Sequence, residues 1–461
     1  MEPIKVVTPT GCIGNRGIHK ESFQAVIANE RPDAVASDAG SLDCGPWYLG
    51  AGKPHSPLRN ITWDLDLLLS ECVPKRIPII IGSAGGSGAR PHVDFTVDLV
   101  HQIAKKRDLK FRLAVIPSDV DQTYLAKRAG EEKIAGLDDQ PALTPEVVRS
   151  CSTIVAMMGV EPMIKALDAG ADVIIAGRAT DNGTIGSFPV WRGADKGLAL
   201  HMGDIMECGD TALVEKQTLL RGLGPNRIPI IGTIGDGYFD LKAGNPKLAC
   251  TPQSAAAHSL YERSSIFSSQ QPGGVLDTSQ TKFEQIDPLT TRVTGTRFVK
   301  QDPYTVLLEG ASRVGYRSVT ILGIRNPRMI AQIDQILEQI RDIEIQIFGD
   351  EGKIQIYWHI YGKNAVLQGK EFRTSSVHEL GVVADVVADT QALAHQVADD
   401  IWLRLCFQRY DGRQTTAGNC GVLFSPNVID AGEAFDLKIY HPLPLRDPCA
   451  LHRVNITEVR S

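Results

Sequence analysis

The sequence predicts an α/β protein with a parallel β-sheet that carries helices on both faces, followed by a smaller α+β domain. Near-continuous runs of Val and Ile recur along the first part of the chain, and such runs are typical of strands buried on both faces. The segments between the runs are long enough for crossover helices. An open, doubly wound sheet is our first interpretation, and a closed eight-stranded barrel with similar spacing is the alternative.

The expected strands of the large sheet are short and rich in branched apolar side chains. In chain order they cover residues 4–7, 33–37, 77–82, 111–116, 152–157, 171–177 and 228–234. Because parallel strands need crossover connections, the segments between them are expected to be largely helical.

The pattern changes near residue 290, where longer amphipathic segments begin. A strand at 317–325 is followed by a helix that Asn326 caps, and strict alternation predicts a strand over 354–360 with one wet or functional face. A second helix follows within 390–410, so we expect two helices packed on an antiparallel sheet. The expected parts of the chain are a domain at 1–290, a domain at 291–410, and an irregular tail at 411–461 that packs back on the body.

Composition and charge limit the classes of partner. The 461 residues contain 48 Lys and Arg against 54 Asp and Glu, a formal charge of −6, so we expect no nucleic-acid partner. No apolar stretch approaches the roughly 20 residues that cross a bilayer, and residues 1–11 lack the pattern of a signal peptide. We expect a soluble, cytoplasmic protein without a membrane partner, whose nine cysteines are reduced thiols.

A glycine-rich turn follows the third expected strand. Its glycines are Gly82, Gly85, Gly86 and Gly88. They allow a close backbone approach, so that several N–H groups could face one carboxylate or phosphate. Arg90 and His92 come directly after the turn and add a cation and a candidate acid or base. The spacing fits neither the Walker motif nor the dinucleotide fingerprint, and a purely structural turn is the alternative.

The loop at 37–57 is long and ionisable. It carries Asp38 and His55 together with Trp47 and Tyr48, two aromatic side chains that are costly to leave in water unless they cover something. Such a loop is typical of a binding element or a mobile lid. The alternative is an ordinary turn with solvated carboxylates.

Residues 176–210 hold the densest group of polar side chains. Arg178 and Asp181 come just after a buried strand, where the guanidinium could clamp a carboxylate and Asp181 could accept a proton. If 200–208 is helical, one face presents His201, Asp204 and Cys208, with Glu207 beside them. These groups could share a divalent metal or transfer protons without one. The alternative is that His201 is a core histidine whose hydrogen bonds are satisfied.

Several segments between residues 4 and 330 carry longer motifs. They read GCIGNR at 11–16, GSAGG at 82–86, GADVIIAGRATD at 170–181, HMGDIMECG at 201–209 and VLDTSQTKFEQID at 275–287. In this order they resemble the acyclic terpene utilisation family, the AtuA-like proteins, and the match through 170–209 is the most specific. The chain departs from the family's pattern at 87–94 and 415–428, so it resembles a divergent branch.

The resemblance implies a role in the breakdown of acyclic terpenoids and branched acyl-CoA compounds. It also implies that the polar end of the first loop, with Arg16, belongs to the substrate-binding surface. The substrate itself does not carry over to a divergent branch.

We expect an enzyme of small-acid or acyl-CoA catabolism, a hydratase, hydro-lyase or C–C lyase acting on a hydroxy acid or its thioester. Adding or removing water beside a carbonyl needs a base, an acid and an electrophile, which these residue types supply without an organic cofactor. A divalent metal is an open option. The alternative is a non-catalytic subunit that binds an acyl ligand or a partner protein, with the alternating strand extending a partner sheet.

A nicotinamide dehydrogenase is a weaker alternative, because Gly11, Gly14 and Gly17 have the wrong spacing for the dinucleotide fingerprint. We also expect a homo-oligomer, since cyclic dimers are the commonest assemblies.

The predicted site residues fall into two groups. The catalytic residues are Asp181, His201, Glu207 and His92. The substrate-binding residues are Gly82, Gly85, Gly86, Gly88, Arg90, Arg178, Asp38, His55 and Arg16. Catalysis by this set requires the glycine turn, Arg178 and His201 to face one hollow.

Overall fold

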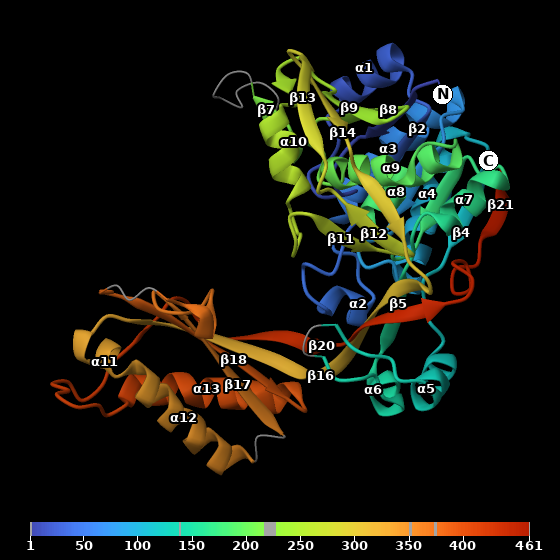
Figure 1. Cartoon of the computed structure of the whole chain (residues 1–461). Coiled ribbons are helices and arrows are strands. Elements are labelled where there is room, and N and C mark those ends of the chain that lie inside the picture. The colour runs from blue at the N-terminus through green and yellow to red at the C-terminus, as the bar shows by residue number, and fades with distance from the viewer. Residues whose placement is uncertain (1, 138–139, 216–226, 350–352, 373–375, 461) are drawn as a thin grey trace. The chain divides into compact units, whose positions relative to one another are not determined.

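A computed structural model describes residues 2–137, 140–215, 227–349, 353–372 and 376–460 (Figure 1). The chain forms two compact units, Met1–Ala311 with Leu437–Ser461, and Ser312–Asp436. It passes from the first unit to the second within β16 (Tyr304–Ile324) and returns within β20 (Val428–Leu445). The predicted boundaries lay at 290 and 410, whereas the units change at Ala311 and Asp436.

The segment 411–461 is not the irregular tail that we expected. It contains the whole of a long strand, β20, and a shorter strand, β21 (Asn455–Val459). Buried and more exposed residues alternate in the last part of β20, as a half-buried strand requires. Gly, Asn and Pro are found mainly in the loop before β20. Because these residues are typical of irregular segments, the whole segment was predicted to be irregular despite the alternation.

The main sheet of the first unit is mixed. Within the described residues its strands are, in spatial order, β13 (Lys282–Asp287), β14 (Thr290–Thr294), β9 (Tyr238–Ala243), β8 (Ile230–Gly235), β1 (Ile4–Thr8), β2 (Ala34–Asp38), β3 (Ile79–Gly82), β6 (Val173–Ala176), β4 (Phe111–Ile116) and β21. Five neighbouring strands, β1, β2, β3, β6 and β4, are parallel to one another. Antiparallel strands extend the sheet on both sides. The expectation of an α/β fold is confirmed, but the sheet is not wholly parallel. Since no pairing joins β13 to β21 among the described strands, the alternative of a closed barrel is wrong.

Helices cover both faces of this sheet, as predicted. One face packs against α1 (Lys20–Glu30), α3 (Leu58–Cys72) and α4 (Arg90–Arg107). The other face packs against α7 (Glu161–Asp168), α8 (Asp181–Trp191) and α9 (Lys196–Met206). Successive strand residues separate between the two apolar clusters, with Val6 and Ile80 in one cluster and Val7 and Ile79 in the other. The continuous apolar runs arise because both sides of each strand are buried.

Smaller elements complete the first unit. They are α2 (Trp47–Ala51), α5 (Gln122–Glu131), α6 (Pro145–Ser150), α10 (Pro252–Ser259), β5 (Thr153–Met157), β7 (Val214–Glu215), β10 (Leu248–Ala249), and a three-stranded sheet of β11 (Ser268–Gln271), β12 (Gly274–Asp277) and β15 (Arg297–Lys300). We expected β5 in the main sheet, but it pairs antiparallel with β16. An apolar run indicates a buried strand without specifying the strand that it pairs with.

The second unit has two helices on an antiparallel sheet. The sheet order is β17 (Ile354–Tyr361), β18 (Leu380–Ala388), β16 and β19 (Gly421–Val422). After the short helix α11 (Pro327–Ala331), the helices α12 (Ile333–Phe348) and α13 (Gln391–Phe407) share one apolar cluster with β17 and β18. Alternation in β17 buries Ile354, Ile356 and Ile360 and leaves Tyr357 and Tyr361 exposed. The strand therefore has the single wet face that its sequence predicts.

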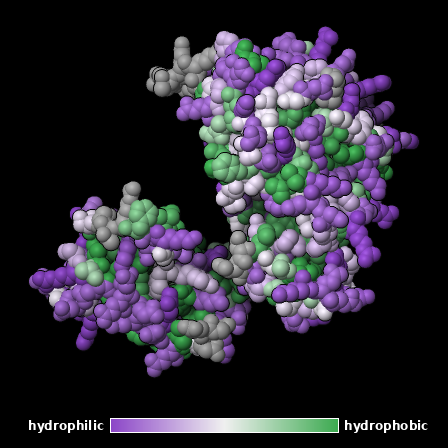
Figure 2. All heavy atoms as spheres, in the orientation of Figure 1, coloured by the Kyte–Doolittle hydropathy of each residue, from purple (hydrophilic) through white to green (hydrophobic). Residues whose placement is uncertain are grey.

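None of the described helices is long and apolar enough to cross a membrane. On the face shown in Figure 2, hydrophobic residues are interspersed among hydrophilic ones.

Candidate active site

The carboxyl ends of the parallel strands bring the predicted loops together. Asp38 is the last residue of β2, and Asp181 is the first residue of α8, shortly after β6 ends. Both strands lie beside β3 in the sheet. Glu207 caps the C-terminal end of α9. Loops at this edge of an open α/β sheet are the usual place for a ligand, because the connections leave a crevice there.

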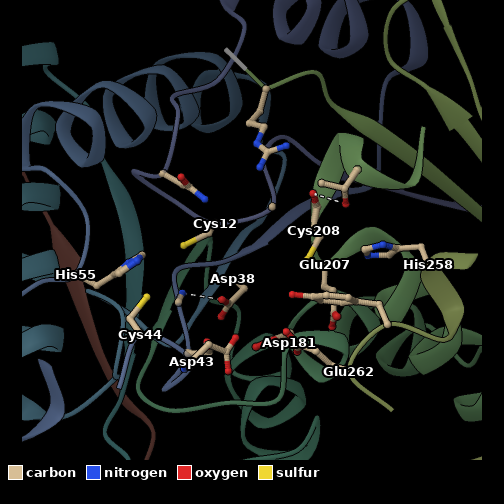
Figure 3. A pocket seen from close by; sticks show the side chains of 17 residues that line it. Cys12, Asp38, Asp43, Cys44, His55, Asp181, Glu207, Cys208, His258 and Glu262 are labelled. Atoms are coloured by element: carbon tan, nitrogen blue, oxygen red, sulfur yellow. Dashed lines mark hydrogen bonds between the residues drawn. The ribbon is translucent and has the colours of Figure 1, made fainter. Parts of the chain in front are cut away.

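A cavity of about 430 Å³ opens among these loops (Figure 3). Five carboxyl side chains line it, those of Asp38, Asp43, Asp181, Glu207 and Glu262. Three thiols and two imidazoles also line it, those of Cys12, Cys44, Cys208, His55 and His258. A second cavity, of about 490 Å³, shares Asp43, Asp181, Glu207 and Glu262 with the first.

Asp181 lies at the junction of the two cavities. Its Oδ1 is 3.9 Å from Nη1 of Arg178 and has no hydrogen-bond partner among the described residues. Burial raises the pKa of Asp181 to about 7, although the nearby Arg178 guanidinium opposes that rise. The side chain can therefore exist in both protonation states near neutral pH, as a general acid or base requires.

Asp38 and Glu207 lie in similar surroundings. Burial and the neighbouring Asp181 raise the pKa of both carboxyl groups well above the usual range. One oxygen of Asp38 accepts a hydrogen bond from the Gly40 N–H at 2.6 Å, and the other, Oδ1, has no partner in the part of the chain that the structure describes. Without a bound cation, these groups tend toward the neutral, proton-carrying form.

The lining of the first cavity is short of positive charge. Arg227 is its single Arg or Lys among the described lining residues, and this guanidinium is paired with Asp210 at 2.5 Å. In the second cavity Arg263 forms an ion pair with Asp204, and Arg178 is paired as described below. Among the described residues, no unpaired Arg or Lys therefore lines the first cavity beside its carboxyl groups.

Among the described residues, Glu207, Cys208 and His258 form a group of three side chains whose donor atoms are close enough to share a metal ion. One donor atom from each lies within 4.8 Å of the others. Glu207 and Cys208 belong to the predicted segment, whereas His258 comes from α10 and was not predicted. In Figure 3 the His258 ring points toward the other two. Nothing in the local sequence around His258 signals this role, because α10 meets the end of α9 only in the folded chain.

The glycine turn does not form the anion site that we expected. The N–H groups of Ser83, Ala84, Gly86 and Gly88 already donate to backbone carbonyls. Neither Gly82 nor any of the other predicted glycines lines either cavity. A Cβ on Gly88 would lie 2.1 Å from the backbone nitrogen of Arg178, and a Cβ on Gly86 would lie 2.8 Å from the Cβ of His55. These glycines are needed because other segments pack directly against the turn.

Arg178 is buried and already paired, so it offers no free clamp for a carboxylate. Its Nε is 2.7 Å from Oε2 of Glu309, and its Nη2 is 3.2 Å from Oε1 of the same side chain. Its Nη1 donates to Ser83 Oγ and to the Ala179 carbonyl. A buried guanidinium requires such a partner, and Glu309, from the distant strand β16, could not be inferred from local sequence.

His201 is a core histidine rather than part of the site. Its two ring nitrogens are each 2.7 Å from a hydroxyl oxygen, of Thr296 and of Ser259, and its ring meets Phe239 edge to face. Burial lowers its pKa to about 3, and it lines neither cavity. Helix α9 ends at Met206, so Cys208 lies beyond the helix that carries His201. The convergence of the glycine turn, Arg178 and His201 on one hollow is therefore wrong.

The remaining predicted residues divide between the cavity and the scaffold. His55 lines the first cavity, with its Nδ1 3.1 Å from Ser56 Oγ. His92 is buried away from both cavities, and its Nε2 lies 3.1 Å from the Tyr48 carbonyl and 3.0 Å from that of Lys53. It thereby fixes the loop around α2. Arg90 and Arg16 are exposed and line neither cavity.

Comparison with known proteins identifies one related family. Residues 55–422, more than half of the chain, match the family described as acyclic terpene utilisation family protein AtuA. No curated protein and no solved structure matches the chain.

Proposed function

The chain belongs to the acyclic terpene utilisation family AtuA, and from this membership we propose that it is a lyase or hydratase of acyl catabolism, with Asp181 as the residue that transfers the proton. The family's role in a catabolic pathway gives the context. The observation that carries the proposal is that the Asp181 carboxyl, with one unpartnered oxygen, lies where two cavities meet beside other carboxyl groups.

The reaction that these groups support best is the reversible loss of water beside a carbonyl. Asp181 would take the proton from the carbon next to the carbonyl, and the electron pair would form the new double bond as the neighbouring hydroxyl leaves. Asp38, whose carboxyl favours the protonated form, would supply the proton that turns the leaving hydroxyl into water. Exchange with solvent would restore both groups.

The charge of the first cavity favours a thioester over a free acid as substrate. A free carboxylate would enter a cavity whose described lining holds five carboxyl groups and a single Arg, which is already paired. The reacting carbonyl of a thioester carries no charge, so it avoids this repulsion. We therefore place the hydroxyacyl thioester ahead of the free hydroxy acid.

A substrate panel tests the proposal. The purified chain is incubated with 3-hydroxyacyl and 2-enoyl thioesters and with the matching free acids, with and without divalent metals, and mass spectrometry follows the gain or loss of one water. We expect turnover of thioesters, and a loss of about 10²- to 10⁴-fold in kcat in Asp181→Asn.

The matched control is Asp94→Asn, which removes an exposed carboxyl from α4 that lines neither cavity and should leave kcat unchanged. Absence of turnover on the whole panel, or full activity in Asp181→Asn, would contradict the proposal.

A second candidate function, a non-catalytic assembly subunit, has one observation in its favour. Strand β17 is at the end of the sheet order and pairs with β18 alone among the described strands. An edge of this kind can accept a strand from another chain. If this is the function, Gln355→Pro should abolish partner binding, while Asp181→Asn should leave it intact.

A further inference from the structure

We propose that Glu207, Cys208 and His258 bind one divalent transition-metal ion, Zn²⁺ or a close analogue, at the wall of the first cavity. The ion would be held by three protein ligands and would keep a coordination position open to the cavity. Metal binding is a property that the chain would have whether or not it turns over a thioester.

The geometry of the three side chains supports this site. Their donor atoms lie within 4.8 Å of one another, and a tetrahedral site with bonds of about 2.0–2.3 Å requires separations of roughly 3.5 Å. Small side-chain rotations therefore suffice to close it. The ligands come from the end of α9 and from α10, two packed elements of the same unit, so the scaffold already holds them together.

His258 has a ring nitrogen that is free to bind a metal ion. Its Nε2 is buried and has no hydrogen-bond partner in the described parts of the chain. The ring stacks on Tyr261, with centroids 5.2 Å apart and an angle of 14° between the planes. This contact fixes the orientation of the imidazole. A buried ring nitrogen without a partner that faces a cavity is available to bind a ligand from that cavity, and a metal ion is one such ligand.

The donor types are those of a borderline-soft metal. A thiolate, an imidazole and a carboxylate together suit Zn²⁺ or Co²⁺ better than Mg²⁺ or Ca²⁺, which prefer oxygen ligands alone. Three protein ligands with a fourth position left open is the arrangement of catalytic rather than structural zinc sites.

The surroundings of the site also favour a cation. Asp38, Asp43, Asp181 and Glu262 line the same cavity as the three ligands. Asp38, which is 5% exposed, keeps Oδ1 without a partner among the residues described. A divalent ion would favour the ionised form of the carboxyl groups near it, which no free Arg or Lys of the described lining does.

In one respect the site deepens the proposed function, and this role of the ion rests on that function. Water loss beside a carbonyl needs an electrophile for the developing enolate, and Arg178 is already paired with Glu309. A metal ion with an open position can polarise a carbonyl oxygen. The ion would then be the electrophile, and Asp181 the proton acceptor.

Cobalt titration of the full chain tests the site in the absence of substrate. We expect one Co²⁺ per chain and a near-ultraviolet charge-transfer band from the cobalt–thiolate bond. Cys208→Ser should remove the band, and His258→Gln should weaken the affinity at least tenfold. Cys44→Ser is the matched control, because it removes another thiol of the same cavity that lies outside the three ligands, and it should retain both.

X-ray absorption of the wild-type chain loaded with Zn²⁺ provides a second measurement that depends on no variant. It should show one sulfur scatterer. Absence of stoichiometric binding, a band that persists in Cys208→Ser, or zinc without a sulfur ligand would overturn the site. Binding with these properties but without turnover of any thioester would instead overturn the proposed function and leave the site intact.

Discussion

Asp64 shows at the residue scale how one buried carboxyl shapes the approach to the candidate site. It is fully buried in α3, and its two oxygens accept the N–H groups of Gly14 and Ile18, each at 2.7 Å. These bonds hold the first loop, which contributes Gly11, Cys12 and Asn15 to the cavity. Asp64 was not among the predicted site residues, since a carboxylate within an amphipathic helix is usually solvated.

Substituting Asp64 should reveal both its hydrogen bonds and its titration. Burial raises the pKa of Asp64 to about 6, above its value in the unfolded chain, and its two backbone hydrogen bonds oppose this. The contribution of the protonated group to stability is therefore full below pH 4 and is lost as the pH rises from about 4 to about 6. Asp64→Asn lacks this dependence and leaves one N–H without its acceptor, at a cost of about 1–3 kcal/mol.

The measurement is urea unfolding of both proteins at pH 4, 5, 6 and 7. The free energy of unfolding of the wild type relative to Asp64→Asn should decrease as the pH rises through this range. A difference that is constant with pH would show that the carboxyl is not shifted. The control is Asp98→Asn, which removes an exposed carboxyl from helix α4.

The two histidines of the predicted site illustrate why residue type alone misleads. His201 and His92 occur in motifs with the right neighbours, yet both are buried and have lowered pKa values. Both ring nitrogens of His201 contact hydroxyl oxygens. Nε2 of His92 contacts two carbonyl oxygens, and its Nδ1, which has no hydrogen-bond partner among the described residues, lines neither cavity. His258 occurs in an undistinguished helix and faces the cavity. Which imidazole brings a free nitrogen to the cavity depends on how distant elements pack, and the local sequence does not specify this packing.

At the scale of elements, the turn between β3 and α4 is a packing surface. Gly88 has a φ of +68°. A Cβ at this position would lie 2.1 Å from the backbone nitrogen of Arg178 and 2.5 Å from the carbonyl carbon of Gly177. Backbone atoms cannot move aside as a flexible side chain would. The glycine pattern that suggested an anion site therefore reflects the close approach of the β6–α8 connection.

Gly88→Ala should consequently destabilise the protein by more than a left-handed conformation alone explains. We expect a loss of at least about 3 kcal/mol, because the change combines backbone strain with overpacking. Gly193→Ala is the matched control: its φ is +89° but no atom lies within 4 Å of the added Cβ, so it should cost about 1–2 kcal/mol. Equal losses in denaturant unfolding of the two variants would contradict this account of the turn.

At the scale of the whole molecule, the chain leaves its first unit and returns to it through β16 and β20. The second unit, Ser312–Asp436, is thus inserted into the first rather than following it in sequence. Long strands that serve both units obscure the boundary, because their alternation continues across it. This is why the predicted bounds at 290 and 410 differ from the ends of the units.

We predict that the chain forms a homo-oligomer. Its edge strand β17 and the exposed Tyr357 and Tyr361 offer a surface for a symmetric contact. Sedimentation velocity over a dilution series should show a species of at least twice 50.1 kDa at micromolar concentration. A single 50.1 kDa species throughout the series would contradict the prediction.

The sequence by itself determined the α/β class, the parallel strands of the main sheet, two helices of the second unit, the family, and three carboxyl residues of the cavity: Asp38, Asp181 and Glu207. These features depend on periodicity and on the position of polar residues after buried strands, which neighbouring residues encode. Only the tertiary structure decided that the sheet is mixed, that Arg178 is paired with Glu309, and that His258 rather than His201 joins Glu207 and Cys208. Strand pairing and side-chain convergence result from burial between distant segments, and many partners satisfy the same local pattern.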